Sequence, residues 1–281
     1  MRRFLVYVLL LWSPVAFAQL FFVEDNTGQF YSVNTSTGAA TLVATIAGIT
    51  SNTIGATESP NPNVLFASSY QDLVSFNVNG TGATTLGTIT GAGIGQNGAE
   101  GLTYCINANV LYGIINTNFF TINPATGARI VALASTTADV EGLACDHSAN
   151  IVYGLASAAG AALYRYVPGT NTWSLVGSTG LDTSGVGLAF DPAAGVLYAV
   201  DGNSGNIYRI NPATAVATLV GSMGIGAVGG GLAFIPGAAP VVASGIPALS
   251  EWVLAGLVVA LGTLGIFAIR RRRNGGSAFP D

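Results

Sequence analysis

Between residues 19 and 237 the sequence alternates apolar and small polar residues over short stretches. A period of two is typical of a β-strand, because successive side chains point to opposite faces of a sheet. Gly, Asn, Pro and Thr, which favour turns, separate these stretches. The pattern therefore predicts an all-β domain built from many short strands.

One segment of this pattern occurs five times. Residues 197–211 align without a gap on residues 20–34, and looser copies begin at Leu65, Leu111 and Val152. A Gly-Leu strand, degenerate in one case, begins at each of five glycines: Gly55, Gly101, Gly142, Gly187 and Gly231. These starts are 46, 41, 45 and 44 residues apart. Four strands in about 40–45 residues is the period of a propeller blade.

The two ends of the repeat array complement each other. The first copy begins at Leu20 without a Gly-Leu strand, whereas the last Gly-Leu strand, residues 231–236, has no copy after it. We expect residues 231–236 to join the sheet formed by residues 19–48. This velcro closure would complete a five-bladed β-propeller of four-stranded blades and leave no long exposed edge. A stacked solenoid would instead need polar capping repeats, which the sequence lacks.

The only long apolar runs lie at the two ends of the chain. Residues 1–18 combine two arginines, a short apolar run and the motif Ala16-Phe17-Ala18, the pattern of a signal peptide cleaved before Gln19. Residues 252–269 carry no charge and would form one C-terminal transmembrane helix of about 27 Å. Four arginines follow and are expected to stay cytoplasmic: Arg270, Arg271, Arg272 and Arg273. A retained N-terminal anchor is the alternative to the signal peptide.

A short motif precedes this apolar run. It consists of Ile246, Pro247, Ala248, Leu249, Ser250, Glu251 and Trp252. With the helix and the arginine cluster that follow, it resembles the IPTL-CTERM sorting tail of Gram-negative bacteria, a family that usually has Thr where Ala248 stands. The resemblance covers residues 246–281. It implies recognition by a membrane-embedded sorting peptidase of the exosortase or archaeosortase type, followed by delivery toward the cell surface.

The repeat domain, residues 19–237, also resembles a known group of proteins. Its Leu-Tyr-x-Val strands and Asn-Pro-Ala-Thr-Gly turns are similar to those of uncharacterised secreted propellers that commonly carry surface-sorting tails. Residues 238–245, made of small residues and Pro, would form a linker. The expected product is an exported, membrane-anchored precursor that is then delivered to the cell surface or outside the cell.

Charge is scarce in the repeat domain and mostly negative. The chain has no lysine, and only three arginines lie between its two ends: Arg129, Arg165 and Arg209. Nucleic acid binding needs several cations on one face to neutralise phosphates. The charge pattern therefore argues against a nucleic acid partner.

Two carboxylates stand immediately before Gly-Leu strands, which would line the central channel. With Asp139 nearby, Glu100 and Glu141 would hold Ca²⁺ through oxygen ligands, as the lactonase-type propellers that the chain resembles do at the channel mouth. Other blades have apolar residues or glycine at this position: Ile54, Val186 and Gly230. The alternative is that these carboxylates bond to neighbouring backbone N–H groups or are solvated.

The remaining candidates favour structural roles. The one histidine, His147, falls in a predicted turn and is expected to be a solvated loop residue. The Gly-x-Gly-x-x-Gly matches at 93–98 and 224–229 do not open a helix after a strand, so they do not indicate a nucleotide site. The acidic segments 24–26 and 201–203 lie in hairpin turns, where Asp and Asn favour the turn itself.

Cys105 and Cys145 are the only cysteines, and export would place them in an oxidising compartment. They are 40 residues apart, whereas Gly101 and Gly142 are 41 apart, so they lie one residue out of register on equivalent inner strands. Their thiols would then face opposite sides of their own sheets, as a bridge between stacked blades requires. We predict this disulfide, with two small buried thiols as the alternative.

Two classes of function fit these features. The first is a surface-sorted propeller that acts as a binding or structural interaction module of the bacterial cell envelope, with an envelope or extracellular ligand. The alternative is a lactonase-like or other hydrolase propeller with a Ca²⁺-dependent site. A catalytic site normally needs a base or nucleophile with a partner, and a chain with one histidine and no lysine favours the first class.

Overall fold

The computed structural model describes residues 17–238, except residues 48, 50–54, 70, 96 and 158–159. The linker after its first residue and the tail at 246–281 lie outside the described residues, as do residues 1–16 of the expected signal peptide. No helix among the described residues is both long and apolar enough to cross a bilayer. The expected transmembrane helix at 252–269 and the arginines after it are outside this part of the chain.

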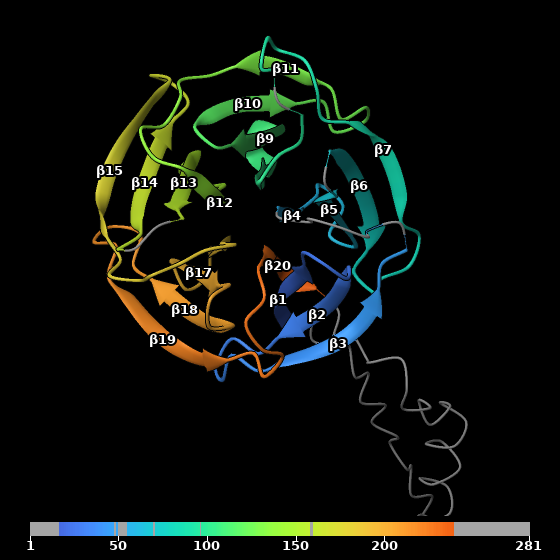
Figure 1. Ribbon diagram of the computed structural model, residues 1–281, viewed down its shortest axis with the longest axis vertical. Helices are drawn as coiled ribbons and strands as arrows, with labels where there is room; N and C mark the ends of the chain where they lie inside the picture. Colours follow the sequence, from blue (N-terminus) through green and yellow to red (C-terminus); the bar gives the residue numbers. More distant parts are fainter. Residues whose placement is uncertain are drawn as a thin grey trace, which may run out of the picture. The chain divides into compact units, whose positions relative to one another are not determined.

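Five four-stranded antiparallel sheets form a ring around a central axis (Figure 1). From the axis outward, the first blade contains β20 (Gly230–Ala238), β1 (Phe17–Glu24), β2 (Gln29–Val33) and β3 (Ala40–Thr45). The second contains β4 (Ala56–Glu58), β5 (Val64–Ser69), β6 (Asp72–Asn77) and β7 (Thr84–Thr88). The third contains β8 (Gly101–Cys105), β9 (Val110–Ile115), β10 (Asn118–Ile122) and β11 (Arg129–Ala132), with a 3₁₀ turn, Ile106–Ala108, after β8.

The fourth blade contains β12 (Val140–Asp146), β13 (Ile151–Ala156), β14 (Ala162–Val167) and β15 (Thr172–Ser178). The fifth contains β16 (Gly187–Asp191), β17 (Val196–Asp201), β18 (Asn206–Ile210) and β19 (Ala217–Ser222). The innermost strands contact one another in the order β4, β8, β12, β16, β20 and back to β4. The predicted five-bladed propeller of four-stranded blades is therefore confirmed.

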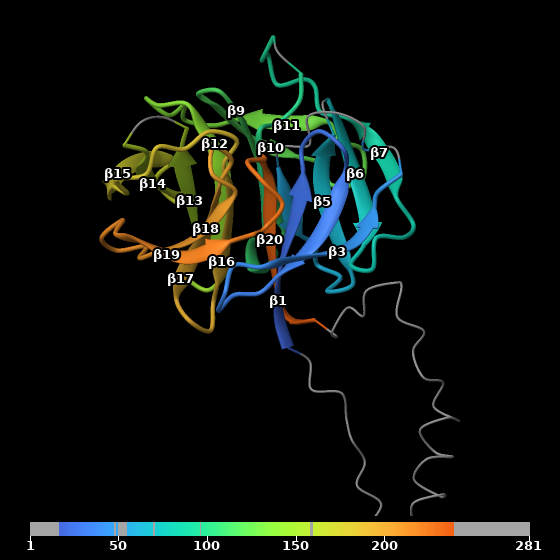
Figure 2. The ribbon, with the colours of Figure 1, turned by 60° about the horizontal axis from the view of Figure 1, so that its bottom comes forward.

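The ring closes through a strand from the far end of the domain. β20 pairs antiparallel with β1, with Phe234 opposite Leu20 and Gly230 opposite Glu24 (Figure 2). Leu232 and Phe234 are buried against the fifth blade. The closure predicted for residues 231–236 is confirmed, and it supplies the innermost strand that the first repeat lacks.

A glycine stands near the start of each innermost strand because the next blade lies against it. A Cβ atom on Gly231 would be 2.2 Å from the backbone nitrogen of Ala56, and one on Gly101 would be 2.5 Å from the carbonyl oxygen of Glu141. The same kind of contact recurs at Gly55 and Gly187, and at Gly142 a Cβ would be 3.0 Å from the Cβ of Leu188 in the next blade. Only a residue without a side chain permits this approach. We call this end of the axis the glycine end, and the opposite end, where the innermost strands finish, the disulfide end.

The fourth residue of the Gly-Leu repeat fills the space between neighbouring blades. In three blades it is an aromatic side chain that stacks on an aromatic of the preceding blade, with ring centroids about 6 Å apart. These residues are Tyr104, Phe190 and Phe234. The other two blades have Glu58 and Cys145 at the equivalent position. Both exceptions lie at the disulfide end.

The outermost strands run around the rim of the ring (Figure 2). Each pairs with the third strand of its blade through a register shift, and this shift occurs in all five sheets. A bulge bends and twists an edge strand, which protects the exposed edge from pairing with another chain. The backbone of the rim is therefore similar in all five blades, so blades differ there mainly in their side chains.

Candidate functional sites at the two ends of the ring

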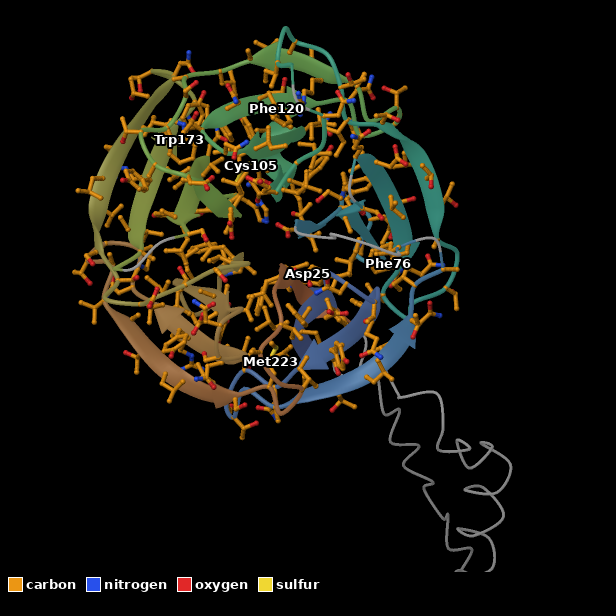
Figure 3. The ribbon with its side chains drawn as sticks, viewed as in Figure 1. Asp25, Phe76, Cys105, Phe120, Trp173 and Met223 are labelled. Carbon is orange, nitrogen blue, oxygen red and sulfur yellow. A yellow bond between two sulfur atoms is a disulfide. The ribbon has the colours of Figure 1, made fainter. Side chains whose placement is uncertain are left out.

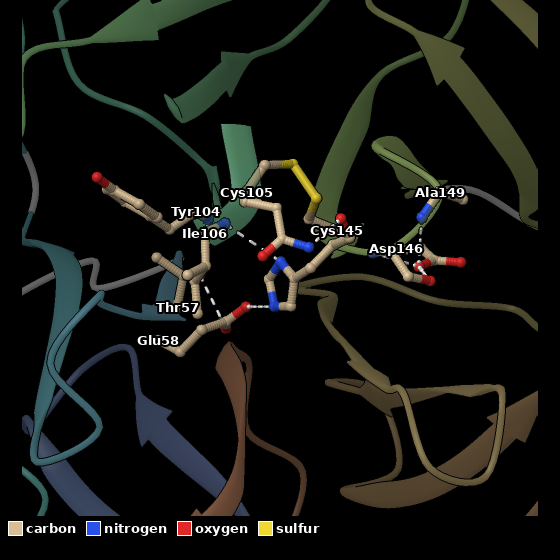
Figure 4. Close-up of a disulfide and its surroundings, with 11 residues drawn as sticks. Thr57, Glu58, Tyr104, Cys105, Ile106, Cys145, Asp146 and Ala149 are labelled. Atoms are coloured by element: carbon tan, nitrogen blue, oxygen red, sulfur yellow. Dashed lines mark hydrogen bonds and ion pairs between the residues drawn. A yellow bond between two sulfur atoms is a disulfide. The ribbon is translucent and has the colours of Figure 1, made fainter. Parts of the chain in front are cut away.

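A disulfide joins the third and fourth blades. Cys105 ends β8 and Cys145 lies near the end of β12, and their Cα atoms are 5.5 Å apart across the bond (Figure 4). Both cysteines are almost completely buried beside Tyr112 and Val152. The structure thus contains the bridge that the one-residue offset predicts, and Cys145 stands where three other blades have an aromatic residue.

His147 lies beside this disulfide and connects three blades. Its Nε2 is 2.9 Å from Oε1 of Glu58 in the second blade, and its Nδ1 accepts a hydrogen bond of 3.3 Å from the backbone N–H of Ile106 in the third. Only 15% of its side chain is exposed. The expectation of a solvated loop histidine is therefore wrong, because Glu58 replaces the usual aromatic residue and bonds to the imidazole.

The hydrogen bonds at the disulfide end determine the tautomer of His147. Because Nδ1 accepts from a backbone N–H, the proton is on Nε2, which donates to the Glu58 carboxylate. The other carboxylate oxygen accepts from the hydroxyl of Thr57, which in turn accepts from the backbone N–H of Tyr104 (Figure 4). Both imidazole nitrogens are engaged, so this network binds blades together rather than offering a base.

Two of the predicted metal ligands bond to backbone N–H groups at the glycine end. Oε2 of Glu100 accepts from Asn116 at 2.7 Å, within its own blade. Oε2 of Glu141 accepts from Val186 at 3.1 Å, in the next blade. These are the contacts that the structural alternative for the two carboxylates predicts. Asp139, the third predicted ligand, is exposed just before β12.

The same carboxylates also interact with one another. Burial raises the pKa of Glu100, and the negative charges of Asp139 and Glu141 raise it further. The structure adds Asp25, whose pKa burial raises to about 6, with further contributions from Glu24 and Glu141. Asp25 lies near the centre of the ring (Figure 3). We call these four residues the acidic group: Asp25, Glu100, Asp139 and Glu141.

Sequence reasoning missed Asp25 because it assigned residues 24–26 to turn chemistry. That assignment describes its neighbour correctly, since the Glu24 carboxylate accepts hydrogen bonds from the backbone N–H groups of Asn26 and Thr27. Asp25 instead places its carboxylate beside Gly229, whose carbonyl oxygen accepts from the Asp25 N–H at 3.1 Å. Only the closed ring brings this turn near Glu141, so the sequence held no local signal.

The members of the acidic group influence one another by charge but do not form a compact set of ligands among the described residues. Among the residues that the structure describes, no three His, Cys, Asp or Glu side chains are grouped closely enough to hold a metal ion. The contributions that lower the pKa values of Asp25 and Glu100 are hydrogen bonds, not neighbouring cations. The glycine end therefore carries negative charge that the described residues do not balance. Calcium binding there stays a prediction.

Comparison with known proteins relates the chain to others by fold. No family model matches the sequence, and no curated protein matches it. Among solved structures, a chain from "Crystal structure of Nidogen/Laminin Complex" aligns with a TM-score of 0.55 and 13% identity, covering 79% of this chain and 99% of that chain. At this identity the likeness shows a shared propeller fold and assigns no activity.

Proposed function

We propose that the protein is an interaction module, displayed outside the inner membrane, whose acidic group recognises a basic segment of an envelope or extracellular protein. One observation supports the proposal: at the glycine end, burial, and after it the negative charges of carboxylates from three blades, raise the pKa values of Asp25 and Glu100. A bound Lys or Arg side chain would relieve this repulsion, because an opposite charge within a few ångströms stabilises the ionised carboxylates. Charge of one sign also steers an oppositely charged partner toward the site.

The direction of β20 supports the glycine end as the recognition face. β20 runs from Gly230 at the glycine end to Ala238 at the disulfide end, and residue 238 leads into the linker. A ring tethered through this residue has its point of attachment at the disulfide end. The acidic group then lies at the end of the ring remote from the tether, where a partner has access.

The export route is part of the same proposal. Residues 1–18 would direct secretion, and residues 246–281 would act as an IPTL-type sorting tail, with a transmembrane helix at 252–269 and a cytoplasmic basic cluster at 270–273. The disulfide between Cys105 and Cys145 supports an oxidising compartment. Intact-mass measurement on protein from each cell fraction tests the route. We expect a mature species outside the inner membrane that lacks the tail, and a full-length mature chain there would contradict sorting.

Binding of a basic peptide tests the recognition face. Full-length protein in detergent is titrated with an oligolysine peptide and with a neutral peptide of equal length. We expect binding of the oligolysine only, weakened about tenfold by Glu141→Gln, because a charge-assisted contact contributes about 1.5 kcal/mol or more. Asp146→Asn is the matched control, since it removes one negative charge from the end of β12 near the disulfide. Equal weakening by both variants would show a non-specific charge effect and contradict the proposal.

The lactonase-like alternative rests on the charges of Asp139 and Glu141 acting on Glu100, and it requires Ca²⁺. Calorimetric titration of the full-length protein with CaCl₂ distinguishes it from peptide recognition. Micromolar uptake that Glu141→Gln abolishes would support a metal site formed by Glu100, Asp139 and Glu141. Oligolysine binding without Ca²⁺ uptake is the result that the interaction module predicts.

A further inference from the structure

A pocket lies on the rim where the fifth blade meets the first. Its volume is about 250 Å³, and six residues line it: Thr35, Ser36, Arg209, Thr218, Leu219 and Val220. The first two belong to the turn between β2 and β3, Arg209 to β18 and the remainder to β19. This seam is separate from the acidic group and from the disulfide end.

The guanidinium of Arg209 is held in place without being neutralised. Its Nε donates to the hydroxyl of Tyr198 at 3.2 Å, and its Nη2 donates to the carbonyl oxygen of Thr35 at 3.0 Å. Its Cζ atom is 5.5 Å from the centroid of the Tyr198 ring. Across the described ranges of the chain, no carboxylate forms a salt bridge with Arg209. Because a guanidinium has five N–H donors, three remain for a ligand.

The pocket combines three chemical features around this cation. An arginine with free N–H groups binds a carboxylate through a planar pair of hydrogen bonds. Thr35, Ser36 and Thr218 bring hydroxyl groups, which exchange hydrogen bonds with other hydroxyls. Val220, which is partly buried and lies on the same face of β19 as Thr218, supplies an apolar surface. A sugar acid carries the matching set: a carboxylate, several hydroxyls and an apolar ring face.

The boundary between the fourth and fifth blades can be compared with the boundary between the fifth and first, where the pocket lies. The comparison shows which features of the pocket the fold does not require. In the fourth blade Arg165 lies opposite Tyr153, as Arg209 lies opposite Tyr198 in the fifth. The outer strands correspond as well, with Leu175 opposite Tyr164 and Leu219 opposite Tyr208. The turns differ, however. The turn between β18 and β19 of the fifth blade has Pro212 and Ala213 where the turn between β2 and β3 of the first blade has Thr35 and Ser36.

The hydroxyl-bearing turn is not needed to build the backbone. In both turns the side-chain oxygen of the first Asn accepts the N–H two residues later, at Ser36 in one and Ala213 in the other, with distances of 2.9 and 2.8 Å. A third turn, at Asn123, forms the same bond with Pro124 and Ala125 in the sequence. Pro-Ala therefore suffices for the fold, and Thr35-Ser36 adds hydroxyls only beside Arg209.

We propose that the rim pocket binds the carboxylate and adjacent hydroxyls of a hexuronate residue in an acidic polysaccharide. Arg209 receives the carboxylate, the hydroxyls of Thr35, Ser36 and Thr218 bond to the sugar hydroxyls, and Val220 contacts the apolar face of the ring. The volume suits one sugar residue, since sites for drug-sized ligands are about 300–1,000 Å³. This inference is independent of the partner proposed for the glycine end.

Titration with an acidic and a neutral oligosaccharide tests the inference. Full-length protein in detergent is titrated calorimetrically with trigalacturonate and with its neutral counterpart, a galactose trisaccharide. We expect binding of trigalacturonate only, weakened at least tenfold by Arg209→Gln, because a charge-assisted hydrogen bond contributes about 1.5–3 kcal/mol. Arg165→Gln is the matched control and should leave the affinity unchanged. Absence of binding, equal binding of the neutral sugar, or equal loss in both variants would overturn the inference.

The double substitution Thr35→Pro with Ser36→Ala tests the hydroxyls separately. It installs the turn sequence that the fifth blade already uses, so the melting temperature should stay close to that of the parent. We expect the affinity for trigalacturonate to fall several-fold while binding of a short Asp-rich peptide, a carboxylate without sugar hydroxyls, stays weak throughout. Unchanged affinity for trigalacturonate, or tighter binding of the peptide, would exclude recognition of a sugar.

Discussion

The two ends of the ring use acidic side chains in opposite ways. At the disulfide end, Glu58 accepts a hydrogen bond from His147, and the network reaches three successive blades. At the glycine end, Asp25 and Glu100 lie among other carboxylates, and burial and like charge raise both pKa values. Glu58 at the first end joins three blades, whereas Asp25 and Glu100 at the second carry charge that the described residues do not balance and that we propose a partner binds.

In this repeat protein, residues that recur in every blade and residues found in one blade only have different roles. The repeated positions supply packing: the glycines at the starts of the inner strands and the aromatics between blades. The specific chemistry lies where one blade departs from the others. Glu58 and Cys145 replace aromatics, Glu141 stands where the next blade has Val186, and Thr35 stands where another turn has Pro212.

Removal of β20 should have the largest effect, because this strand spans both ends of the ring. A chain that stops at Gly229 loses Leu232, Phe234 and Ile235, each no more than 2% exposed. Burial of each such side chain contributes about 1.5–3 kcal/mol, a large share of the 5–15 kcal/mol typical of a domain. We expect no cooperative thermal transition by circular dichroism. A chain that stops at Ala243 should keep one, and a cooperative melt of the shorter chain would contradict the closure.

Loss of the disulfide should come next and should affect one end only. The bond closes a separation of 40 residues, for which the chain-entropy model gives about 3–4 kcal/mol. The variant with Cys105→Ser and Cys145→Ser should lose about this much free energy of unfolding in urea, with oligolysine binding at the glycine end retained. Alkylation of the unreduced, denatured parent is the control, and two labelled thiols per chain would contradict the bond.

A methyl group at the glycine end should cost somewhat less. Gly231→Ala places a Cβ 2.2 Å from the backbone nitrogen of Ala56, so the two inner strands must separate. Overpacking of this kind costs about 1–3 kcal/mol. Gly169→Ala is the matched control, because nothing lies within 4 Å of a Cβ there. If urea unfolding gives equal stability for the two variants, the close approach of the inner strands is not what requires the glycines.

The features that follow from the repeat itself could be predicted from the sequence. The unmatched strand at 231–236 predicted the closure, and the one-residue offset between Cys105 and Cys145 predicted the disulfide. Both predictions depend only on the register along equivalent strands. The position of the Gly-Leu strands around the axis follows from the same register. The sorting tail lies outside the described residues and stays a prediction.

The contacts between blades that are not neighbours could not be predicted. The bond between His147 and Glu58 crosses over the third blade, so it depends on how far each loop extends toward the axis and not on repeat register. Asp25 is near Glu141 only because the first and fourth blades face each other across a closed ring. Local chemistry identified the turn at residues 24–26 correctly but gave no information about what lies opposite it.

The smallest expected effect is a pH dependence that distinguishes the two ends. The pKa of Asp25 rises from 3.8 to about 6 in the folded protein, so the folded state holds this proton more tightly than the unfolded state between these values. Ionisation of Asp25 therefore destabilises the fold as the pH rises through this window. Asp25→Asn should gain about 1 kcal/mol over the parent at pH 7, after allowance for solvent screening of a partly exposed group, and nothing at pH 3. Urea unfolding of the parent and of Asp25→Asn at pH 3, 5 and 7 measures this gain. If the stability difference between the parent and Asp25→Asn is the same at all three pH values, ionisation of Asp25 does not destabilise the fold and the prediction is wrong.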